Sequence, residues 1–472
     1  MKLHTFKIGG VHPEENKITA EIPTKVAELP KQAIFMLSQH IGAPAKAVVQ
    51  RGDKVKVGTL LAEAGGFVSA PVYSSVSGTV AKIDNVYDAT GYRKPAIIIN
   101  VDEEDEWEES IDRSDTLETL AAHPELTSEE IVNRVKVAGV TGMGGAGFPT
   151  FIKLCPPPTA KAEFVIINAV ECEPYITSDY RLMMEHADEI LVGVELLMKA
   201  AKVDKGFIGI EENKPEAIRL LTELCKEHAG IEVVPLKTKY PQGGEKQLVD
   251  AVVGRQVPAP PAIPVNVGAI VQNVGTAYAV YQAVMKNKPL FERYTTVTGK
   301  HIKNPSNFLV RMGTPMSQLI EACGGLPDDD NKVLAGGPMM GKAVISLDVP
   351  VCKGTNAITV LTGKDAHRKE AQACIRCGKC VEACPMGLEP YLLATLSVNK
   401  MFDQLEQEEV VSCISCGSCQ FTCPAHRPLL DNIANGKGAV MGIIRGRAMK
   451  AKAEAEKAKA EAEKAKPADA KA

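Results

Sequence analysis

The spacing of apolar and polar residues changes along the chain. Between residues 47 and 83 the two kinds alternate and are interrupted by glycine-containing turns, which predicts short strands. Further on, apolar runs alternate with helical patterns. Residues 135–140, 163–168 and 205–210 read as strands buried on both faces, and residues 187–201 read as an amphipathic helix. Alternating strands and helices predict an α/β unit with a mostly parallel sheet.

Three segments do not follow these patterns. Residues 102–118 are strongly acidic, contain the only tryptophan and are predicted to be a solvated linker at a domain boundary. Residues 256–268 are rich in proline and are predicted to be an extended connection. The heptapeptide AKAEAEK occurs at residues 451–457 and again at 458–464. Its composition favours an isolated helix, but it has no large apolar residue at any heptad position, so a solvated tail is predicted.

Two segments resemble known domain types. The order of residues 47–83 is similar to that of the biotinyl/lipoyl-type barrel-sandwich fold, whose carriers present a modifiable lysine at a hairpin tip. The corresponding stretch, residues 67–77, contains no lysine, which favours a structural or docking role over a swinging arm. Residues 294–325 read as strands around one helix and resemble the β-grasp domain called SLBB.

Composition and charge argue against several classes of protein. At roughly 150 residues per domain, 472 residues suffice for about three domains. The net charge of −4 gives no basic field for nucleic acid. No apolar run approaches the roughly 20 residues of a membrane span, and residues 1–10 lack the apolar core of a signal peptide. We therefore expect neither an integral membrane protein nor a secreted one. Thirteen cysteines without an export signal predict a reducing compartment.

Eight of the cysteines lie in two copies of the spacing C-x2-C-x2-C-x3-C-P, which is typical of bacterial two-cluster ferredoxins. Three cysteines of each copy come from one tight loop, and the fourth, at the start of the following helix, is expected to serve the neighbouring cluster. One 4Fe–4S cluster is therefore assigned to Cys374, Cys377, Cys380 and Cys423, and the other to Cys413, Cys416, Cys419 and Cys384.

Paired zinc sites are the alternative, because C-x2-C pairs also bind zinc. Three evenly spaced cysteines, twice over, favour iron–sulfur clusters. The remaining five cysteines are scattered singly, and each is expected to be a small buried apolar residue. These are Cys155, Cys172, Cys225, Cys323 and Cys352.

A glycine-rich loop lies between the first predicted strand and a predicted helix. Gly142, Gly144 and Gly147 form a G-x-G-x-x-G pattern, and Pro149 suits the first turn of a helix. Glycines let the backbone approach a phosphate, and a helix N-terminus favours its negative charge. The next strand starts too soon for a crossover helix of ordinary length, so a Rossmann NAD site of the usual kind fits poorly. An ordinary turn is the alternative interpretation of this loop alone.

Four motifs, taken together, favour a binding site over an ordinary turn. They are GMGGAGFPTFIKL at 142–154, NAVECEP at 168–174, YPQGGEKQL at 240–248 and VQNVGTAYAV at 271–280. They appear in the order of similar motifs in the FMN- and NADH-binding subunit of respiratory complex I. With the barrel-sandwich-like segment and the two cysteine motifs added, residues 1–435 resemble the family of C subunits of Rnf (Rsx) ion-translocating oxidoreductase complexes.

The resemblance implies a role for each matching position. The first glycine loop would cradle the phosphate of FMN or nucleotide, Lys153 would supply charge near it, and Phe148 would stack on NADH. Asn168, Glu171 and Glu173 would line the isoalloxazine and nicotinamide pocket. The implied cofactor-binding residues are Gly142, Gly144, Gly145, Gly147, Phe148, Lys153, Asn168, Glu171, Glu173, Tyr240, Gly243, Gly244, Glu245, Gln272 and Asn273.

Three positions depart from the complex I motifs. Met143 stands for an arginine, Val170 for an aspartate and Gln272 for an asparagine. Each departure removes or changes a polar contact, so weaker flavin binding is the expected consequence.

The fold expected from pattern and resemblance is multidomain α/β and β. Its domains are a lipoyl-like barrel-sandwich domain with the acidic linker (1–115), a Rossmann-like α/β FMN/NADH domain (116–289), a β-grasp SLBB domain (290–362), a helical ferredoxin-like domain with two 4Fe–4S clusters (363–435) and the solvated tail (436–472).

The combination implies a mechanism. NADH gives two electrons as a hydride and a 4Fe–4S cluster accepts one, so FMN is needed between them. The resemblance implies hydride exchange at FMN, relay through two clusters, and an oxidoreductase subunit without a catalytic acid or base. It also implies partners, namely other subunits of an Rnf-type complex including a ferredoxin-like one, at the cytoplasmic side of the cell (inner) membrane. The alternatives are a soluble diaphorase module of a hydrogenase or formate dehydrogenase, and a two-cluster scaffold without enzymatic activity.

Overall fold

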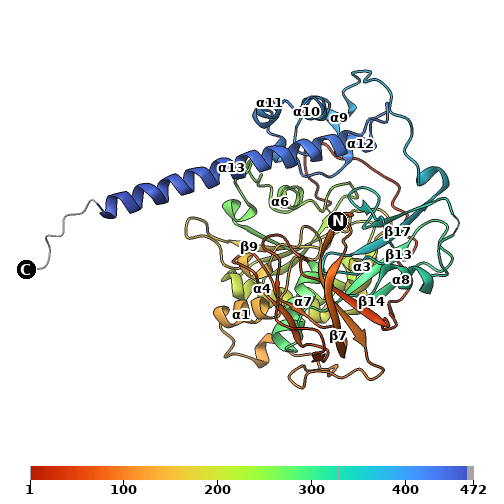
Figure 1. Ribbon diagram of the computed structural model, residues 1–472, viewed down its shortest axis with the longest axis vertical. Coiled ribbons are helices and arrows are strands. Elements are labelled where there is room, and N and C mark those ends of the chain that lie inside the picture. The colour runs from red at the N-terminus through yellow and green to blue at the C-terminus, as the bar shows by residue number, and fades with distance from the viewer. Residues whose placement is uncertain (1, 328, 465–472) are drawn as a thin grey trace, which may run out of the picture. The chain divides into compact units, whose positions relative to one another are not determined.

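A computed structural model describes residues 2–327 and 329–464 (Figure 1). The described residues form two compact units. The larger contains the residues up to Lys7 together with Val11–Arg368, and the smaller contains Ile8–Gly10 and the residues from Lys369 onward. The chain therefore separates the glycine loops, in the larger unit, from both cysteine motifs, in the smaller one.

The N-terminal strands form two small sheets around an apolar core, as the alternating pattern predicts. One sheet has the order β2-β8-β7-β4 and the other the order β3-β5-β6. Phe35, Leu61, Val76 and Ile97 are fully buried between them. The strands are β2 (Gln32–Met36), β3 (Lys46–Ala47), β4 (Lys54–Val55), β5 (Leu60–Glu63), β6 (Val72–Tyr73), β7 (Gly78–Tyr87) and β8 (Arg93–Val101).

A parallel sheet of four strands forms the centre of the larger unit, in the order β11-β10-β9-β12. The predicted strands at 163–168 and 205–210 and the helix at 187–201 are confirmed. The strands are β9 (Phe164–Asn168), β10 (Gly206–Glu211), β11 (Ile231–Leu236) and β12 (Ala269–Asn273). The helices between and after them are α3 (Ser178–Glu185), α4 (Ala187–Ala201), α5 (Pro215–Leu224), α6 (Glu245–Val253) and α7 (Val274–Met285).

The predicted strand at 135–140 is wrong, because this segment ends helix α1 (Ser128–Val137). The Thr127 side chain caps the helix by accepting from the backbone N–H of Glu130. Ile131 and Val135, one helical turn apart, are buried on the same face. The apolar run thus reflects a helix face and the turn that follows it. Helix α2 (Thr150–Lys153), after the glycine loop, has only four residues, which agrees with the predicted lack of a full crossover helix.

The β-grasp prediction corresponds to a six-stranded sheet in the order β1-β14-β13-β17-β15-β16. Helix α8 (Met316–Ala322) buries Leu319 and Ile320 in the core beside this sheet. The short edge strand β1 comes from the N-terminal part of the chain, which the sequence pattern did not reveal. The strands are β1 (Lys25–Val26), β13 (Glu292–Thr298), β14 (Ser306–Arg311), β15 (Asn331–Ala335), β16 (Lys342–Ala343) and β17 (Ala357–Thr362).

The acidic segment 102–118 is not simply a solvated linker, which corrects the sequence-based prediction. Trp107 packs edge-on against Phe291 with 5.6 Å between ring centroids, and the guanidinium of Arg311 lies 4.7 Å from its indole ring. Ile111 is buried in the same small apolar cluster. Two apolar side chains among the acids therefore dock the segment on the larger unit.

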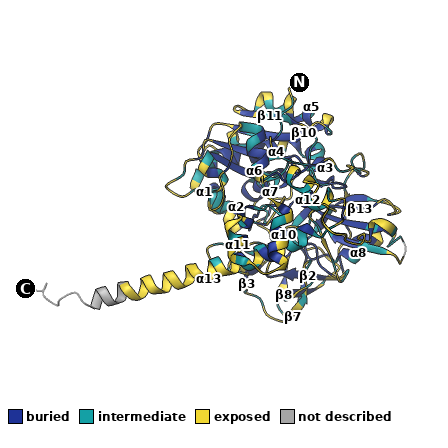
Figure 2. Cartoon of the chain, turned by 90° about the horizontal axis from the view of Figure 1, so that it is seen from above, coloured by how far each residue is buried: buried dark blue, intermediate teal, exposed yellow. Residues whose placement is uncertain are grey.

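Short helices form the smaller unit around both cysteine motifs, and a long helix completes it. That helix, α13 (Leu429–Lys464), begins in the core and continues as the exposed rod drawn in yellow in Figure 2. The predicted solvated helix is confirmed for residues 445–458, which are exposed. Val440, inside the predicted tail 436–472, is buried in the core of the smaller unit, because the first turns of α13 pack there, so the solvated part begins later than predicted. Residues 465–472 lie outside the described residues. Within the described part of the chain, no helix is long and apolar enough to cross a membrane. The other helices are α9 (Lys379–Glu382), α10 (Pro390–Val398), α11 (Phe402–Gln407) and α12 (Ser418–Phe421).

Candidate functional site

The order of the parallel strands creates a switch point. From β9 the chain adds β10 and β11 on one side and then returns to place β12 on the other side. The carboxyl ends of β9 and β12 are in register, with Asn168 opposite Asn273. In open parallel sheets, ligands bind in the crevice where the strand order reverses. Two residues implied by the resemblance therefore mark the binding position expected from topology alone.

The glycine loop is seated on the end of β12. Its base is closed by a hydrogen bond from the Gly142 N–H to the Phe148 carbonyl at 2.8 Å. A Cβ atom on Gly144 would lie 2.7 Å from Nδ2 of Asn273, so only glycine allows this close approach. Gly145 is exposed and has open space around the position of a Cβ. The structure thus brings the first and fourth motifs together and leaves the middle of the loop accessible.

Two of the three departures from the complex I motifs are core residues here. Met143 is 7% exposed in the main apolar core, and its N–H donates to Oγ1 of Thr276 at 3.0 Å. Val170 is fully buried in a second apolar cluster. An apolar side chain at each position stabilises packing.

The third departure, Gln272, is 2% exposed, and neither atom of its amide has a hydrogen-bond partner within the described residues. The hydroxyls of Thr141 and Thr150, at the two ends of the glycine loop, are also buried and unpartnered there. Buried polar groups almost always have partners. These three groups fit a polar ligand such as FMN bound beside the loop.

Lys153 and Glu245, both implied by the resemblance, form an ion pair. The Lys153 ammonium lies 2.6 Å from the Glu245 carboxylate and donates to the Val271 carbonyl at 3.0 Å. Gly244 precedes the first residue of α6, and a Cβ there would lie 2.4 Å from Oε1 of Gln247. The pair therefore joins the second glycine loop to the first at the end of β12.

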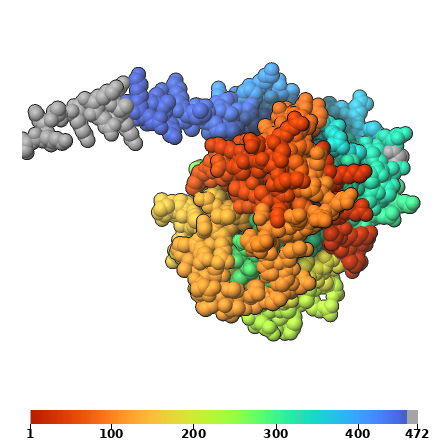
Figure 3. Space-filling view, turned by 60° about the horizontal axis from the view of Figure 1, so that its bottom comes forward, coloured from red at the N-terminus to blue at the C-terminus, as the bar shows by residue number. Residues whose placement is uncertain are grey.

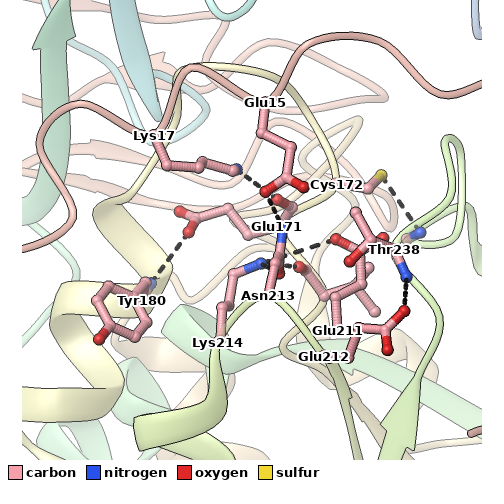
Figure 4. Close-up of polar contacts among 12 residues, drawn as sticks. Glu15, Lys17, Glu171, Cys172, Tyr180, Glu211, Glu212, Asn213, Lys214 and Thr238 are labelled. Atoms are coloured by element: carbon pink, nitrogen blue, oxygen red, sulfur yellow. Dashed lines mark hydrogen bonds and ion pairs between the residues drawn. The ribbon is translucent and has the colours of Figure 1, made fainter.

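The loop after β9 sends the side chains of Glu171 and Cys172 to two different elements (Figure 4). The Glu171 carboxylate accepts from the N–H groups of Asp179 and Tyr180 at the start of α3, at 2.6 and 3.2 Å. The Cys172 sulfur accepts from the N–H of Gly243 at 3.3 Å. Burial raises the pKa of the Glu171 carboxyl to about 7. This side chain therefore holds a helix terminus, and its implied contact with flavin stays a prediction.

Glu173 continues this arrangement toward the β-grasp sheet. Its carboxylate accepts from the N–H groups of Met339 and Met340 at 2.6 and 3.1 Å, and Tyr240 hydrogen-bonds to it. Asn168 donates through Nδ2 to the Gly243 carbonyl at 2.7 Å. The second and third implied motifs are thus fixed to one another, with both implied carboxylates engaged by protein groups.

A half-buried lysine that no sequence motif indicates holds this loop. The Lys17 ammonium donates to the carbonyls of Glu171, Glu173 and Ile176 at 2.7, 2.9 and 2.7 Å. Burial lowers its pKa to about 8. Lys214, which is buried, donates to the Val170 carbonyl at 2.7 Å. A single lysine far from any motif carries no local pattern, so only the fold identifies these two residues.

The two cysteine loops of the smaller unit repeat one backbone conformation. Arg376 and Ser415 both have a left-handed φ of 55°, and Gly378 and Gly417 follow with φ of 78° and 80°. Each loop then enters a four-residue helix, α9 or α12. The repeated spacing in the sequence thus produces two copies of one loop.

The fourth cysteine of each motif lies with the other motif. Cys384 lines one cavity together with Cys413, Cys416 and Cys419. Burial raises the pKa of the Cys380 thiol, and the nearby thiols of Cys423 and Cys377 raise it further. Cys374, the eighth implied ligand, is exposed at the start of the first loop. The cavity that Cys384 shares with the second motif fits the crossed arrangement, and the full ligand assignment stays a prediction.

The donor set fits 4Fe–4S clusters. Among the described residues no group of three or more His, Cys, Asp or Glu side chains is arranged to hold a single metal ion. A cubane spreads its four thiolates over four irons and needs them farther apart. Backbone N–H groups of Leu388 and Ser415 lie 3.4 Å from the sulfurs of Cys384 and Cys413.

The five single cysteines are more varied than expected. Cys323 is buried, whereas Cys155 is exposed and the others are half-buried. The prediction that each is a buried apolar residue is therefore wrong for Cys155, which lies in the loop after α2.

Four known families match the chain in series. They are the RnfC barrel sandwich hybrid domain over residues 4–104, the Nuo51 FMN-binding domain over 135–282, the SLBB domain over 294–343 and the 4Fe-4S dicluster domain over 366–424. The expected fold class is confirmed, and the cofactors are FMN and iron–sulfur clusters.

Curated relatives match over most of the chain. The C subunit of a proton-translocating ferredoxin:NAD(+) oxidoreductase complex from Clostridium ljungdahlii is 44% identical over 86% of this chain and 87% of its own length. The C subunit of a Na(+)-translocating ferredoxin:NAD(+) oxidoreductase complex from Acetobacterium woodii is 43% identical over 92% of this chain and 96% of its own length. Among solved structures, NAD+-reducing [NiFe]-hydrogenase in the air-oxidized state matches 69% of each chain at 19% identity, with a TM-score of 0.48.

Proposed function

Because the chain belongs to the family of C subunits of ion-translocating ferredoxin:NAD(+) oxidoreductase complexes, we propose that it exchanges electrons between NADH and its two 4Fe–4S clusters through FMN. The observation that carries this proposal is the position of the glycine loop, at the point where the strand order of the parallel sheet reverses. The same chain provides the eight thiols of two clusters.

In this proposal the residues of the larger unit bind and orient FMN and NADH. The exposed backbone around Gly145 receives the phosphate, and the unpartnered amide of Gln272 hydrogen-bonds to the flavin or its ribityl chain. Lys153 supplies positive charge, which Glu245 holds in place. Phe148, half-buried at the end of the loop, stacks on NADH. FMN, when bound, converts between a two-electron hydride and single electrons. No side chain needs to act as an acid or base.

The smaller unit relays electrons one at a time. Cys374, Cys377, Cys380 and Cys423 bind one cluster, and Cys413, Cys416, Cys419 and Cys384 bind the other. Because each motif would supply its fourth cysteine to the other cluster, this ligand set would hold the two clusters close together. From there the electrons pass to or from a ferredoxin-like subunit of the complex.

We place the chain peripherally at the cytoplasmic side of the cell membrane, bound to the other subunits of an Rnf-type complex. There electron flow between NADH and ferredoxin is coupled to ion movement. The named relatives translocate protons in one case and Na⁺ in the other. Ion movement belongs to the complex, and the contribution of this chain is the electron transfer.

An anaerobic NADH titration of the iron-reconstituted chain tests the proposal. About eight irons and one FMN per chain, with flavin and then clusters reduced by NADH in absorbance and EPR spectra, are the expected result. Eight irons with no flavin and no response to NADH would leave a two-cluster relay and contradict the nucleotide site.

A pair of glycine variants locates the phosphate. Gly145 and Gly354 are both exposed and both have open space around a Cβ, so alanine at either position leaves the fold intact. We expect Gly145→Ala to weaken FMN retention by about tenfold, since a cradle of backbone N–H groups tolerates no side chain. Gly354→Ala is the matched control. Equal flavin content in both variants would place the phosphate elsewhere.

A further inference from the structure

The hairpin loop between β5 and β6 displays an aromatic ring where lipoyl-like carriers display their lysine. Phe67, in the middle of this loop, is 79% exposed. The surface of the N-terminal residues, red and orange in Figure 3, adjoins that of the lighter orange residues that follow in the larger unit. Nothing in the electron-transfer chemistry described above uses this ring.

The backbone that carries Phe67 is fixed. Oγ of Ser69 accepts from the N–H of Gly65 at 2.9 Å, and the Val68 carbonyl accepts from the N–H of Ala43 at 2.9 Å. Nε2 of His40 lies 3.1 Å from the N–H of Ala70. The loop that carries the exposed ring is therefore held by hydrogen bonds. A ligand that stacks on Phe67 would not have to order this loop first.

Hydrogen bonds connect this loop and the neighbouring segment at residues 40–43, which supports it, to the glycine loop and the turn before it. The N–H of Ile41 donates to the Gly147 carbonyl at 3.3 Å, next to His40. The buried Lys353 ammonium donates to the carbonyls of Pro71 and Gly139 at 2.7 Å each. The first of these bonds reaches the end of the glycine loop, and the Lys353 ammonium reaches the turn before it. The position of Phe67 relative to the nucleotide site is thus set by hydrogen bonds.

Among the described residues the aromatic neighbour of Phe67 is Phe151, which lies in the helix directly after the glycine loop. The Phe67 ring lies edge-on to Phe151 at 6.5 Å between centroids, and Phe151 is the second residue of α2. The Lys136 ammonium lies 5.5 Å from the Phe151 ring and adds positive charge there. An aromatic, cationic surface therefore lies at helix α2, directly after the glycine loop.

We propose that Phe67, together with Phe151, is the surface on which the adenine of NADH stacks. This inference rests on the proposed function. The nicotinamide must reach the flavin at the strand ends, so the adenosine half extends outward past the glycine loop. Adenine is a flat aromatic base that stacks on aromatic side chains. The charge of Lys136 favours the pyrophosphate next to it. The barrel-sandwich domain thus contributes a specificity-determining residue to the site.

Comparison of NADH with reduced nicotinamide mononucleotide, which lacks the adenosine, tests this inference. For Phe67→Ala we expect the KM for NADH to rise on the order of tenfold, since base stacking on an aromatic is of that size. The kcat and the KM for the mononucleotide stay unchanged. Phe67→Tyr keeps the ring and restores the KM. Tyr92→Ala removes an aromatic that is 69% exposed on the same domain and serves as the control.

The outcomes separate this inference from the proposed function. If the wild-type chain oxidises neither substrate, the proposed function fails. If it oxidises both and Phe67→Ala changes neither KM, or changes both equally, the adenine assignment is overturned. A variant with unchanged KM values that no longer assembles with membrane subunits would also overturn it and would assign Phe67 to a protein partner.

Discussion

The two cofactor regions of this protein are built in opposite ways. The cluster ligands come from one continuous stretch, residues 374–423, and two copies of one loop present them. The nucleotide site is gathered from four separated motifs. It is held in addition by lysines at positions 17 and 353, which lie in different parts of the chain.

This difference shows which parts of a site are determined by a few neighbouring residues and which depend on the whole fold. A cysteine spacing and a glycine that accepts a positive φ determine a loop over a few residues. A nucleotide pocket needs loops whose relative positions are set by a sheet and by buried hydrogen bonds. A change in the cluster region should therefore affect one cluster, whereas a distant change should affect the nucleotide site as a whole.

The crossed cluster assignment gives the largest expected effect. Cys384→Ala should remove the cluster of the second motif, because the Cys384 thiol shares a cavity with Cys413, Cys416 and Cys419. Iron should fall from about eight to about four per chain, with the EPR signal of one cluster retained. Cys155→Ala, which changes an exposed single cysteine, should keep both clusters. Selective loss of the first motif's cluster would contradict the crossing.

Removal of the Lys17 ammonium should affect the flavin and leave the iron unchanged. In Lys17→Met three carbonyls lose their shared donor, and left-handed Glu171 and Tyr175, with φ of 48° and 71°, are no longer held. We expect flavin retention to fall about tenfold, because a misplaced loop weakens the whole site. Flavin released from purified protein and iron content are the measurements.

Lys46→Met changes an exposed lysine of the same N-terminal region and serves as the control for Lys17→Met. Full flavin content in both variants would show that the loop keeps its shape without the ammonium. An equal loss of iron and flavin would instead indicate general unfolding.

The smallest expected effect is a pH dependence. Burial lowers the pKa of Lys353 to about 7 from an ordinary value of 10.5. Between these values the unfolded chain binds a proton that the folded chain does not, so stability from this group rises with pH above 7. The slope is at most about 1.4 kcal/mol per pH unit.

Lys353→Met should remove this slope. Denaturant unfolding, followed by the fluorescence of Trp107 in the same unit, measures it between pH 7 and 9. The difference in the free energy of unfolding between wild type and variant should grow as the pH rises. Lys364→Met, at an exposed position, should show no such widening. A constant difference across this range would place the proton on Lys353 in the folded state.

Most of the secondary structure can be predicted from the sequence, and the exceptions have physical reasons. Residues 187–201 form helix α4 with the predicted bounds, because a helical period is a local property. The pattern of residues 135–140 predicts a strand, because a short apolar run does not distinguish a helix face from a buried strand. Trp107 and Ile111 dock an acidic segment whose charge pattern predicts a solvated linker.

The candidate site divides in the same way. The glycines and the strand-end asparagines can be found from motifs, and the structure brings them together. The environments of Glu171 and Glu173 cannot be found from motifs. Their partners are the start of α3 and the loop at Met339, which the sequence does not mark as neighbours. Phe67 belongs to a loop that stands out in the sequence only for the lysine it lacks.

The sequence by itself determined the cluster ligands, the glycine loops and the types of domain, because each depends on spacing within a short stretch. Tertiary structure alone decided which carbonyls the ammonium groups of Lys17 and Lys353 join and which side chains cap which helices. It also decided that Lys353 connects the loop of Phe67 to the turn before the glycine loop. The physical reason is that a buried lysine or carboxylate must find partners wherever the fold provides them. Those partners follow from packing, and no local pattern in the chain records them.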